Sequence, residues 1–218
     1  MINPTHPRER LIRTASTLVH RQGWTLTGIN QILTEAGIPK GSFYYYFRSK
    51  EALGVAVLER HHENLAQLMQ RTLLDAEQPP MASVSAFFLE LSNGPLAEIY
   101  RFGCPAGNMA CESATQCPPL LNEAQRSVEL YRQSWEKLVR RAKTDGLVCR
   151  GTDPAELAST IVMLLQGAFL ATRSAGTFEP LEKAHTAVSQ LLFDDSQQSM
   201  LATRYSAQMT AAPHALAS

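Results

Sequence analysis

The 218-residue chain has few charged residues and no net charge, and both features limit what it can be. Charged residues make up 18% of the sequence, below the roughly 25% typical of globular proteins. The 20 basic and 20 acidic residues cancel, while 44% of the residues are apolar. This composition argues against a disordered chain and excludes a general electrostatic attraction to nucleic acid. We expect one or two compact domains with a full hydrophobic core.

Several signals are missing, and each absence removes a class of protein. The N-terminus lacks the apolar core of about 7–15 residues that defines a secretory signal, and no segment approaches the ~20 apolar residues of a membrane span. The sequence contains no G-x-S-x-G, H-E-x-x-H, G-x-x-x-x-G-K or dinucleotide-binding motif. It also shows no strand-like alternation and no internal repeat. We therefore expect an all-α, cytoplasmic protein that binds rather than catalyses and has no membrane partner.

Cysteine is scarce, with four residues in the whole chain. The spacing of Cys104, Cys111 and Cys117 is loose, and no histidine lies nearby, so it does not indicate a zinc site. We expect no metal and no cofactor. Two interpretations stay open for these thiols. They are inert packing residues, or Cys104 senses oxidants or electrophiles, because it lies at a predicted helix N-terminus whose dipole stabilises a thiolate. Cys104 and Cys111, seven residues apart, are expected on one helix face.

What the sequence does have is a basic N-terminal region. Residues 1–50 contain seven Lys or Arg residues and two Glu residues, a net charge of +5, so the other 168 residues carry −5. A local concentration of positive charge is the electrostatic footprint of a nucleic-acid-binding surface.

Within this region, residues 29–50 combine two short helix signatures around a tight turn. Apolar residues recur at i, i+3, i+4 and i+7 and form one helical stripe at Ile29, Ile32, Leu33 and Ala36. Gly37 follows where a helix commonly ends in a left-handed residue, and Pro39 is suited to the first turn of a new helix. That helix carries Lys40 and three consecutive tyrosines at 44–46. The pattern is typical of a helix-turn-helix.

From about Arg8 to Leu58 the sequence resembles the DNA-binding domain of the TetR family of bacterial transcriptional repressors. Thr27 opens the first helix of the motif, AGIPKGSFYYYF follows at 36–47, and SKEAL follows at 49–53. Pro39 departs from the family, which usually has a small hydroxyl residue there. Within the family, KGSFYYYFRSKEA and the later FGCPAGNMACESA are similar to repressors of the N-ethylmaleimide-reductase type and to some drug-efflux repressors. The corresponding cysteine in the former is responsive, which the resemblance extends to Cys104 only.

The resemblance implies a ligand-responsive repressor that binds a palindromic double-stranded DNA operator as a homodimer. It places base contacts near Lys40, Gly41 and Tyr45. It places phosphate contacts at Thr27, Ser42, Tyr44, Tyr46 and Lys50, and Gly28 and Asn30 complete the expected set. The chemistry agrees, because lysine can donate to guanine O6 and N7 and glycine allows close backbone approach. The alternative is that the tyrosines pack the domain and expose only their hydroxyl groups. Phe43 and Phe47 are expected in its core.

The rest of the chain predicts further helices. Their expected ranges are 7–22 before the motif, and then 49–75, 81–100 with a kink or break at Gly94-Pro95, 104–117, 118–145, 153–174 and 179–193. Residues 196–218 are expected to fray or to add one helical turn. We therefore predict a three-helix DNA-binding head, residues 1–48, and a helical ligand-binding and dimerisation body, residues 49–218.

The body is expected to bind a small, largely apolar effector. The candidate lining residues are apolar side chains with three polar ones to orient the ligand: Phe87, Phe88, Leu91, Phe102, Asn108, Met109, Tyr131, Trp135, Met163, Gln166 and Phe169. The alternative, that most of these only fill the core, stays open. As in the family, the helices at 153–174 and 179–193 are expected to form the dimer interface, partly burying Leu157, Ile161, Leu164, Leu165, Val188 and Leu191.

Overall fold

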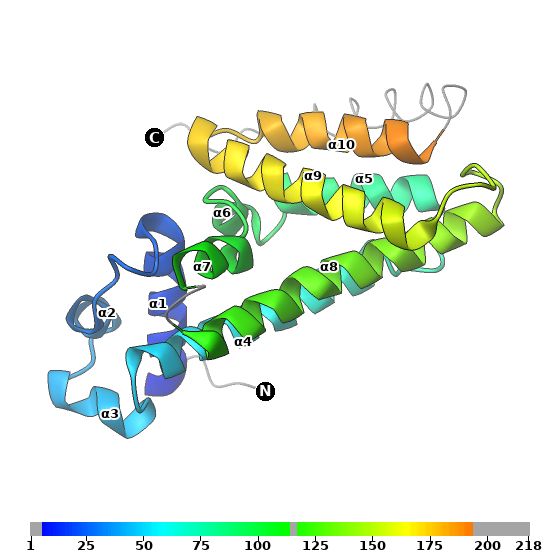
Figure 1. Cartoon of the computed structure of the whole chain (residues 1–218). Helices are drawn as coiled ribbons and strands as arrows, with labels where there is room; N and C mark the ends of the chain where they lie inside the picture. The colour runs from blue at the N-terminus through cyan, green and yellow to red at the C-terminus, as the bar shows by residue number, and fades with distance from the viewer. Residues whose placement is uncertain (1–5, 114–116, 194–218) are drawn as a thin grey trace. The chain divides into compact units, whose positions relative to one another are not determined.

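The computed structural model describes residues 6–113 and 117–193, and these residues form α-helices, one 3₁₀ turn and no strand (Figure 1). The expectation for residues 196–218 lies outside the described residues. The all-α prediction is confirmed. In chain order the elements are α1 (Pro7–Gln22), α2 (Ile29–Ala36), the 3₁₀ turn η1 (Lys40–Ser42), α3 (Phe43–Tyr46), α4 (Lys50–Arg71), α5 (Pro80–Asn93), α6 (Ala97–Tyr100), α7 (Pro105–Ser113), α8 (Pro118–Thr144), α9 (Pro154–Ala175) and α10 (Glu179–Leu192).

The chain forms two compact units, which do not divide at residue 48. Among the described residues, the first unit contains 6–67, 102–113 and 117–130, and the second contains 68–101 and 131–193. Helices α4 and α8 each contribute to both units. The predicted head is therefore part of a larger first unit, because the first part of α4, α7 and the first part of α8 pack with it.

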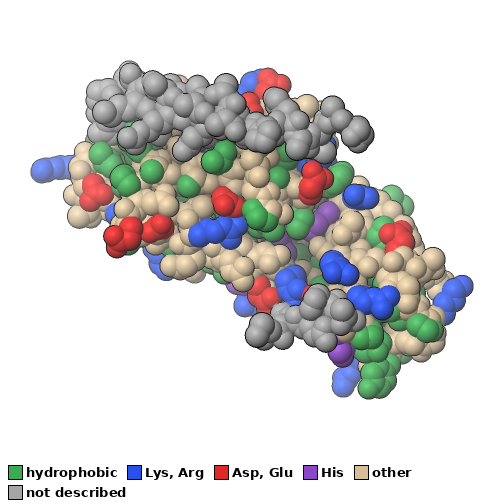
Figure 2. Space-filling view, turned by 180° about the vertical axis from the view of Figure 1, so that it is seen from behind, with side chains coloured by type: hydrophobic (Ala, Val, Ile, Leu, Met, Phe, Trp, Pro, Cys, Tyr) green, Lys and Arg blue, Asp and Glu red, His purple; other side chains and the backbone are tan. Residues whose placement is uncertain are grey.

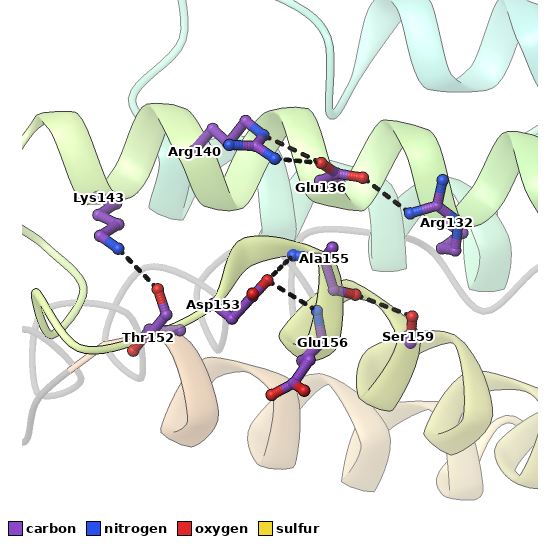
Figure 3. Close-up of polar contacts among 9 residues, drawn as sticks. All are labelled: Arg132, Glu136, Arg140, Lys143, Thr152, Asp153, Ala155, Glu156 and Ser159. Carbon is purple, nitrogen blue, oxygen red and sulfur yellow. Dashed lines mark hydrogen bonds and ion pairs between the residues drawn. The ribbon is translucent and has the colours of Figure 1, made fainter.

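The starts of α4 and α9 follow from side-chain caps that the sequence predicts. The Ser49 hydroxyl accepts the Ala52 N–H at 3.2 Å and begins α4. The Asp153 carboxylate accepts the N–H groups of Ala155 and Glu156 at 2.8 and 3.2 Å and begins α9 (Figure 3). The hydrogen bond from the Glu156 N–H, and to a lesser extent that from the Ala155 N–H, holds the pKa of the Asp153 carboxyl below its usual value. The predicted break at Gly94-Pro95 is confirmed, because α5 and α6 are separate helices, and one expected range changes, since α4 ends at Arg71 and not at residue 75.

An aromatic cluster forms the core of the second unit. Its rings come from four helices and are all buried: Phe87 and Phe88 of α5, Tyr100 of α6, Tyr131 and Trp135 of α8, and Phe169 of α9. The Phe87 and Trp135 ring centroids lie 5.3 Å apart edge to face, and those of Tyr100 and Phe169 lie 5.2 Å apart and stack. The Tyr100 and Tyr131 hydroxyl oxygens lie 2.9 Å apart. Helix α10 packs on α9 and α5 and covers this core.

Charged side chains of α8 in this unit pair along the helix. Glu136 binds Arg132 at 2.7 Å and Arg140 at 2.6 Å, one turn away in each direction (Figure 3). Its hydrogen bonds to Arg140 and then Arg132 lower the pKa of the Glu136 carboxyl. Lys143 donates to the Thr152 carbonyl at 2.7 Å and ties α8 to the turn before α9. These charged side chains of α8 therefore bind residues that are close to them in the sequence.

Helix α9 is more apolar than the sequence reading allowed. It has 22 residues and a mean hydropathy of 1.5 over its most apolar window, which by length and composition alone would suit a membrane span. One such helix is weak support for a membrane protein, since a core helix of a soluble protein has the same composition. Ile161, Leu165 and Phe169 of α9 are buried in the second unit, whereas Met163 and Leu170 are exposed.

Candidate DNA-binding surface and effector site

The two helices of the helix-turn-helix are joined by Gly37 and held by an arginine of α1. Gly37 is left-handed, with φ 62° and ψ 40°, as the sequence predicts. Arg10 donates from Nη2 to the Gly37 carbonyl at 3.2 Å and to the Ala36 carbonyl, which are acceptors left open at the end of α2. Arg8 places its guanidinium over the Phe47 ring, 5.1 Å from the centroid. These two cations, of which Arg8 is exposed and Arg10 is half-buried, therefore tie α1 to the motif.

The tyrosine-rich element has a buried side and an exposed side. Phe43 and Phe47 lie in the core, as predicted, with ring centroids 6.0 Å apart. Tyr44 and Tyr45 are 70% and 84% exposed, and Tyr46 is half-buried with its ring edge-on to Tyr45 at 4.9 Å. At the end of the unit that carries α3, exposed hydrophobic side chains, a class that includes tyrosine, lie beside Lys and Arg side chains (Figure 2).

Several other expected DNA-binding residues share this exposure. Gly28, Asn30, Lys40 and Gly41 are exposed, and Ser42 is half-buried. A Cβ atom built on Gly28 or Gly41 would meet no atom within 4 Å, so both backbones are open to approach by another molecule. Helix α2 begins at Gly28 without a side-chain cap, which leaves N–H groups of its first turn available to an anion.

Thr27 is the exception, and its expected phosphate contact needs correction. Its side chain is 0% exposed, its hydroxyl donates to the Gly23 carbonyl at 2.6 Å, and it accepts from Gln22 Nε2 at 3.3 Å. A hydroxyl held in this way cannot reach a phosphate on the surface. Thr27 instead fixes the turn between α1 and α2, which is a structural reason for threonine at the start of the motif.

Lys50 is also engaged within the unit. Its ammonium donates to the Trp24 carbonyl at 2.7 Å and lies 4.4 Å from the centroid of the Trp24 ring. Burial lowers the pKa of Lys50. One of its three donors is therefore occupied, and a phosphate contact would use the remaining two.

Leu26 is an exposed residue that the sequence patterns do not mark as a site residue. It is 75% exposed, beside Gly28 and the start of α2. Helical periodicity could not find it, because it lies in the turn between two helices and belongs to neither apolar stripe. The sequence signal that could have identified Leu26 is a large apolar residue in a turn, where polar residues are expected.

The expected effector residues fall into different parts of the molecule. Phe87, Phe88, Tyr131, Trp135 and Phe169 come together in the aromatic cluster with Leu91 nearby in α5, and all six are buried. Phe102, Asn108 and Met109 belong to the first unit, where Asn108 Nδ2 donates to the Phe102 carbonyl at 2.8 Å. Gln166 is half-buried on α9.

Met163 does not lie with the other expected effector residues of the second unit. Its side chain is 67% exposed, because α9 turns its residues 163 and 170 away from the core of its own unit. A cavity of about 450 Å³ lies elsewhere, between residues 146–150 and Leu191–Phe193, and none of the expected effector residues lines it. The Trp135 indole Nε1 is buried and has no hydrogen-bond acceptor among the residues that the structure describes.

The expected dimer residues also divide. Ile161, Leu165 and Val188 are fully buried inside their own subunit, so they cannot form a seam with another one, whereas Leu191 is exposed and Leu157 and Leu164 are half-buried. A different set is exposed on α9 at helical spacings of three and four, comprising Thr160, Met163, Gly167, Leu170 and Ser174.

The cysteines do not share a helix face as expected. Cys104 lies just before α7, is 2% exposed and accepts the Gly107 N–H on its sulfur at 3.4 Å, whereas Cys111 is exposed. The four cysteines form no disulfide. Among the residues that the structure describes, no group of three or more His, Cys, Asp or Glu side chains is arranged to hold a metal ion.

Comparison with known proteins gives matches along most of the chain. Residues 11–57 match the family described as bacterial regulatory proteins, tetR family, and residues 80–188 match the tetracyclin repressor-like C-terminal domain. The HTH-type transcriptional repressor NemR of Escherichia coli K12 is 30% identical over 190 residues, which cover 85% of this chain and 93% of NemR. The HTH-type transcriptional repressor DhaR of Mycobacterium sp. strain GP1 is 27% identical over 193 residues, which cover 88% and 96%.

Solved structures agree with these matches. The regulatory protein TetR from Rhodobacter sphaeroides superposes with a TM-score of 0.79 at 26% identity, covering 87% of this chain and 99% of that one. The reduced form of E. coli NemR superposes with a TM-score of 0.73 at 27% identity, covering 85% and 97%.

Proposed function

Because the chain belongs to the TetR family of bacterial transcriptional regulators, we propose that it is a ligand-responsive repressor that binds a palindromic DNA operator as a homodimer in the cytoplasm. Its relatives are DNA-binding transcriptional repressors, so the chain is a regulator and not an enzyme. The observation that carries the proposal is the exposure of Lys40, Tyr44 and Tyr45 on an element anchored by buried Phe43 and Phe47.

The exposed residues suit the major groove of DNA. Lys40 donates to guanine O6 and N7, and the ring of Tyr45 contacts a thymine methyl group, so both read sequence. The hydroxyls of Ser42, Tyr44 and Tyr46 donate to phosphates, as do the N–H groups at the open start of α2. Together these contacts fix the position of η1 and α3 on the duplex.

Selection from random duplexes tests the DNA-binding function. Purified protein is incubated with a random duplex library, and the bound fraction is amplified and sequenced over several rounds. A dimer with two identical heads should enrich an inverted repeat whose half-sites are about one helical turn or a multiple of it apart. Enrichment of no motif, or of a single unrepeated site, contradicts the proposed dimeric repressor.

The exposed stripe of α9 supports the dimer. A Cβ atom on Gly167 would meet nothing within 4 Å in its own subunit, so a second copy can approach the α9 backbone there. Met163 and Leu170 flank Gly167 and would bury their side chains in that contact. Gly167→Leu should weaken the dimer, so that the mass measured by light scattering falls towards the 24.1 kDa of one subunit. Exposed Gly151, with similar open space but on the turn before α9, provides the control Gly151→Leu.

The aromatic cluster supports an uncharged effector. Its rings offer no charged partner, and burial of an unpaired charge there would be strongly unfavourable. The buried Trp135 N–H favours a ligand with a hydrogen-bond acceptor, because an unsatisfied buried donor costs about 1–3 kcal/mol. A panel of neutral aromatic carbonyl compounds should contain members that raise the melting temperature and weaken operator binding. Trp135→Phe should reduce both effects, and a ligand that stabilises the protein without weakening operator binding is not an inducer.

A second candidate mode of release is covalent. Cys104 lies at the N-terminus of α7 and its sulfur accepts a backbone N–H, which supports stabilisation of a thiolate. Its burial means that a reagent reaches it only when the region opens. Intact-mass measurement after mild electrophile treatment tests this in a variant that retains Cys104 alone, with Cys104→Ser as control. Loss of operator binding that depends on Cys104 would replace the reversible effector.

A further inference from the structure

We propose that Glu112 of α7 is a positioning residue that holds the α1–α2 turn, and through it the helix-turn-helix, in the arrangement that binds DNA. This inference rests on the proposed repressor function. The contact lies within the first compact unit.

The central contact joins Glu112 to a backbone donor of the turn. Glu112 Oε2 accepts the Thr25 N–H at 2.8 Å, across 87 residues of sequence. The carboxylate also lies against Gly23, where a Cβ atom would stand 2.8 Å from Oε1. Gly23 has φ 94°, which L side chains rarely adopt, so glycine provides both the backbone conformation and the room for the carboxylate.

The neighbouring residue, Trp24, is fixed from two more sides. Its carbonyl accepts Lys50 Nζ at 2.7 Å, and its ring lies against Gly54, where a Cβ atom would stand 2.7 Å from a ring carbon. Leu120 of α8 contacts the same place, 2.8 Å from that Cβ position. Residues 23–25 are thus held by α4, α7 and α8, and Glu112 supplies the charged hydrogen bond.

The held turn leads directly into the DNA-binding surface. Two residues separate Thr25 from Gly28, the open start of α2, and buried Thr27 lies between them. Burial lowers the pKa of Lys50, and the charges of Glu51 and then Glu112 oppose that effect. Because α7 begins beside Cys104 and carries Glu112 near its other end, a shift of α7 would act on the turn and change the orientation of α2.

The sign of the effect distinguishes positioning from simple electrostatics. Removing a negative charge from a DNA-binding unit should by charge alone leave affinity unchanged or raise it. Loss of the Glu112 hydrogen bond should instead lower it, by at most about 10- to 150-fold, which is the full value of a hydrogen bond to a charged group, about 1.5–3 kcal/mol. Glu112→Gln keeps an acceptor oxygen and should restore most of the affinity.

The experiment compares the full-length wild type with Glu112→Ala, Glu112→Gln and the matched control Glu59→Ala, an exposed acid of α4. Operator affinity is measured by fluorescence anisotropy on the duplex selected by the wild type, and hydrogen exchange is measured at the Thr25 amide. We expect Glu112→Ala to weaken binding at least fivefold and to speed Thr25 exchange, while Glu59→Ala changes neither. Thermal unfolding and light scattering establish that each variant remains folded and dimeric.

Three results would overturn the inference. Faster Thr25 exchange with unchanged operator affinity would make Glu112 a surface contact only. Equal changes in operator affinity for Glu112→Ala and Glu59→Ala would show that Glu112 has no specific role, and an equal rise would assign the change to charge. Failure of Glu112→Gln to restore affinity would remove the hydrogen bond as the cause. A wild-type protein that selects no duplex would contradict the repressor function itself, which separates that failure from failure of the positioning role.

Discussion

The tyrosine-rich element of the first unit, which we propose to bind DNA, and the aromatic cluster of the second unit use the same kinds of side chain in opposite ways. In the first unit Tyr44 and Tyr45 are exposed and two buried phenylalanines hold them in place. In the second unit Tyr100 and Tyr131 are buried, and their hydroxyls bind each other at 2.9 Å. An exposed aromatic residue therefore points to a binding role more directly than a buried one, because core packing is sufficient to account for burial.

The largest expected effect distinguishes residues that stabilise the tyrosine-rich element from residues proposed to contact DNA. Phe43→Ala should lower the free energy of unfolding by about 3–5 kcal/mol, because it empties a fully buried site. Tyr45→Ala, two residues away, should leave unfolding almost unchanged and weaken binding to the selected duplex. Chemical denaturation measures the free energy of unfolding of both variants, and fluorescence anisotropy measures their affinity for the duplex. Similar unfolding free energies for the two variants would contradict the different roles of Phe43 and Tyr45.

Buried histidines allow the two units to be compared by pH. Burial, together with the smaller effects of His20 and His62, lowers the pKa of His61 in the first unit to about 3, and burial lowers the pKa of His185 in the second unit to about 4. The unfolded chain binds these protons below about pH 6.5 and the folded chain does not. Stability should thus be highest above that pH and fall between about 6.5 and 3–4, with each histidine costing about 2 kcal/mol by pH 5.

Denaturant unfolding at pH 7 and pH 5 measures this loss. His61→Leu and His185→Leu should each remove their own share of the difference between the two pH values, whatever they do to stability at pH 7. A difference that persists unchanged in both variants would place the pH dependence on other groups.

A base-reading role for Lys40 gives a smaller and more specific effect. Lys40→Ala should cost about 1–3 kcal/mol on the selected duplex and relax selectivity at one base pair. Arg48→Ala, on an exposed residue just after α3, should instead weaken all duplexes alike and reduce the salt slope by about one. Anisotropy on selected and scrambled duplexes across salt concentrations separates them, and equal losses for Lys40→Ala on both duplexes would exclude base reading.

The smallest expected effect concerns the buried hydroxyl pair. Tyr131→Phe should destabilise the protein by about 0.5–1.5 kcal/mol, the net value of one hydrogen bond, and leave binding to the selected duplex unchanged in the absence of effector. Tyr44→Phe, at an exposed tyrosine, should leave the stability of the protein unchanged and weaken binding to the selected duplex. Urea unfolding and anisotropy for both variants would complete the comparison of buried and exposed tyrosines.

Much of the fold and of the DNA-binding element was predictable because it depends on local chemistry. Gly37 ends α2, Asp153 caps α9, and Phe43 and Phe47 repeat at one helical turn, so short-range patterns located these features. The effector residues were less predictable. The same apolar pattern describes Trp135, which is buried in the aromatic cluster, and Met163, which is exposed on α9.

The sequence by itself determined the all-helical fold, the helix-turn-helix and the family, because backbone propensities, caps and motif spacing act over a few residues. Only the tertiary structure decided which side of each helix is buried. It placed Thr27 inside the turn, joined Lys50 to Trp24, and brought Glu112 to Thr25 across 87 residues. The physical reason is that a hydrogen-bond partner or a burial state depends on elements far away along the chain, and local periodicity carries no information about them.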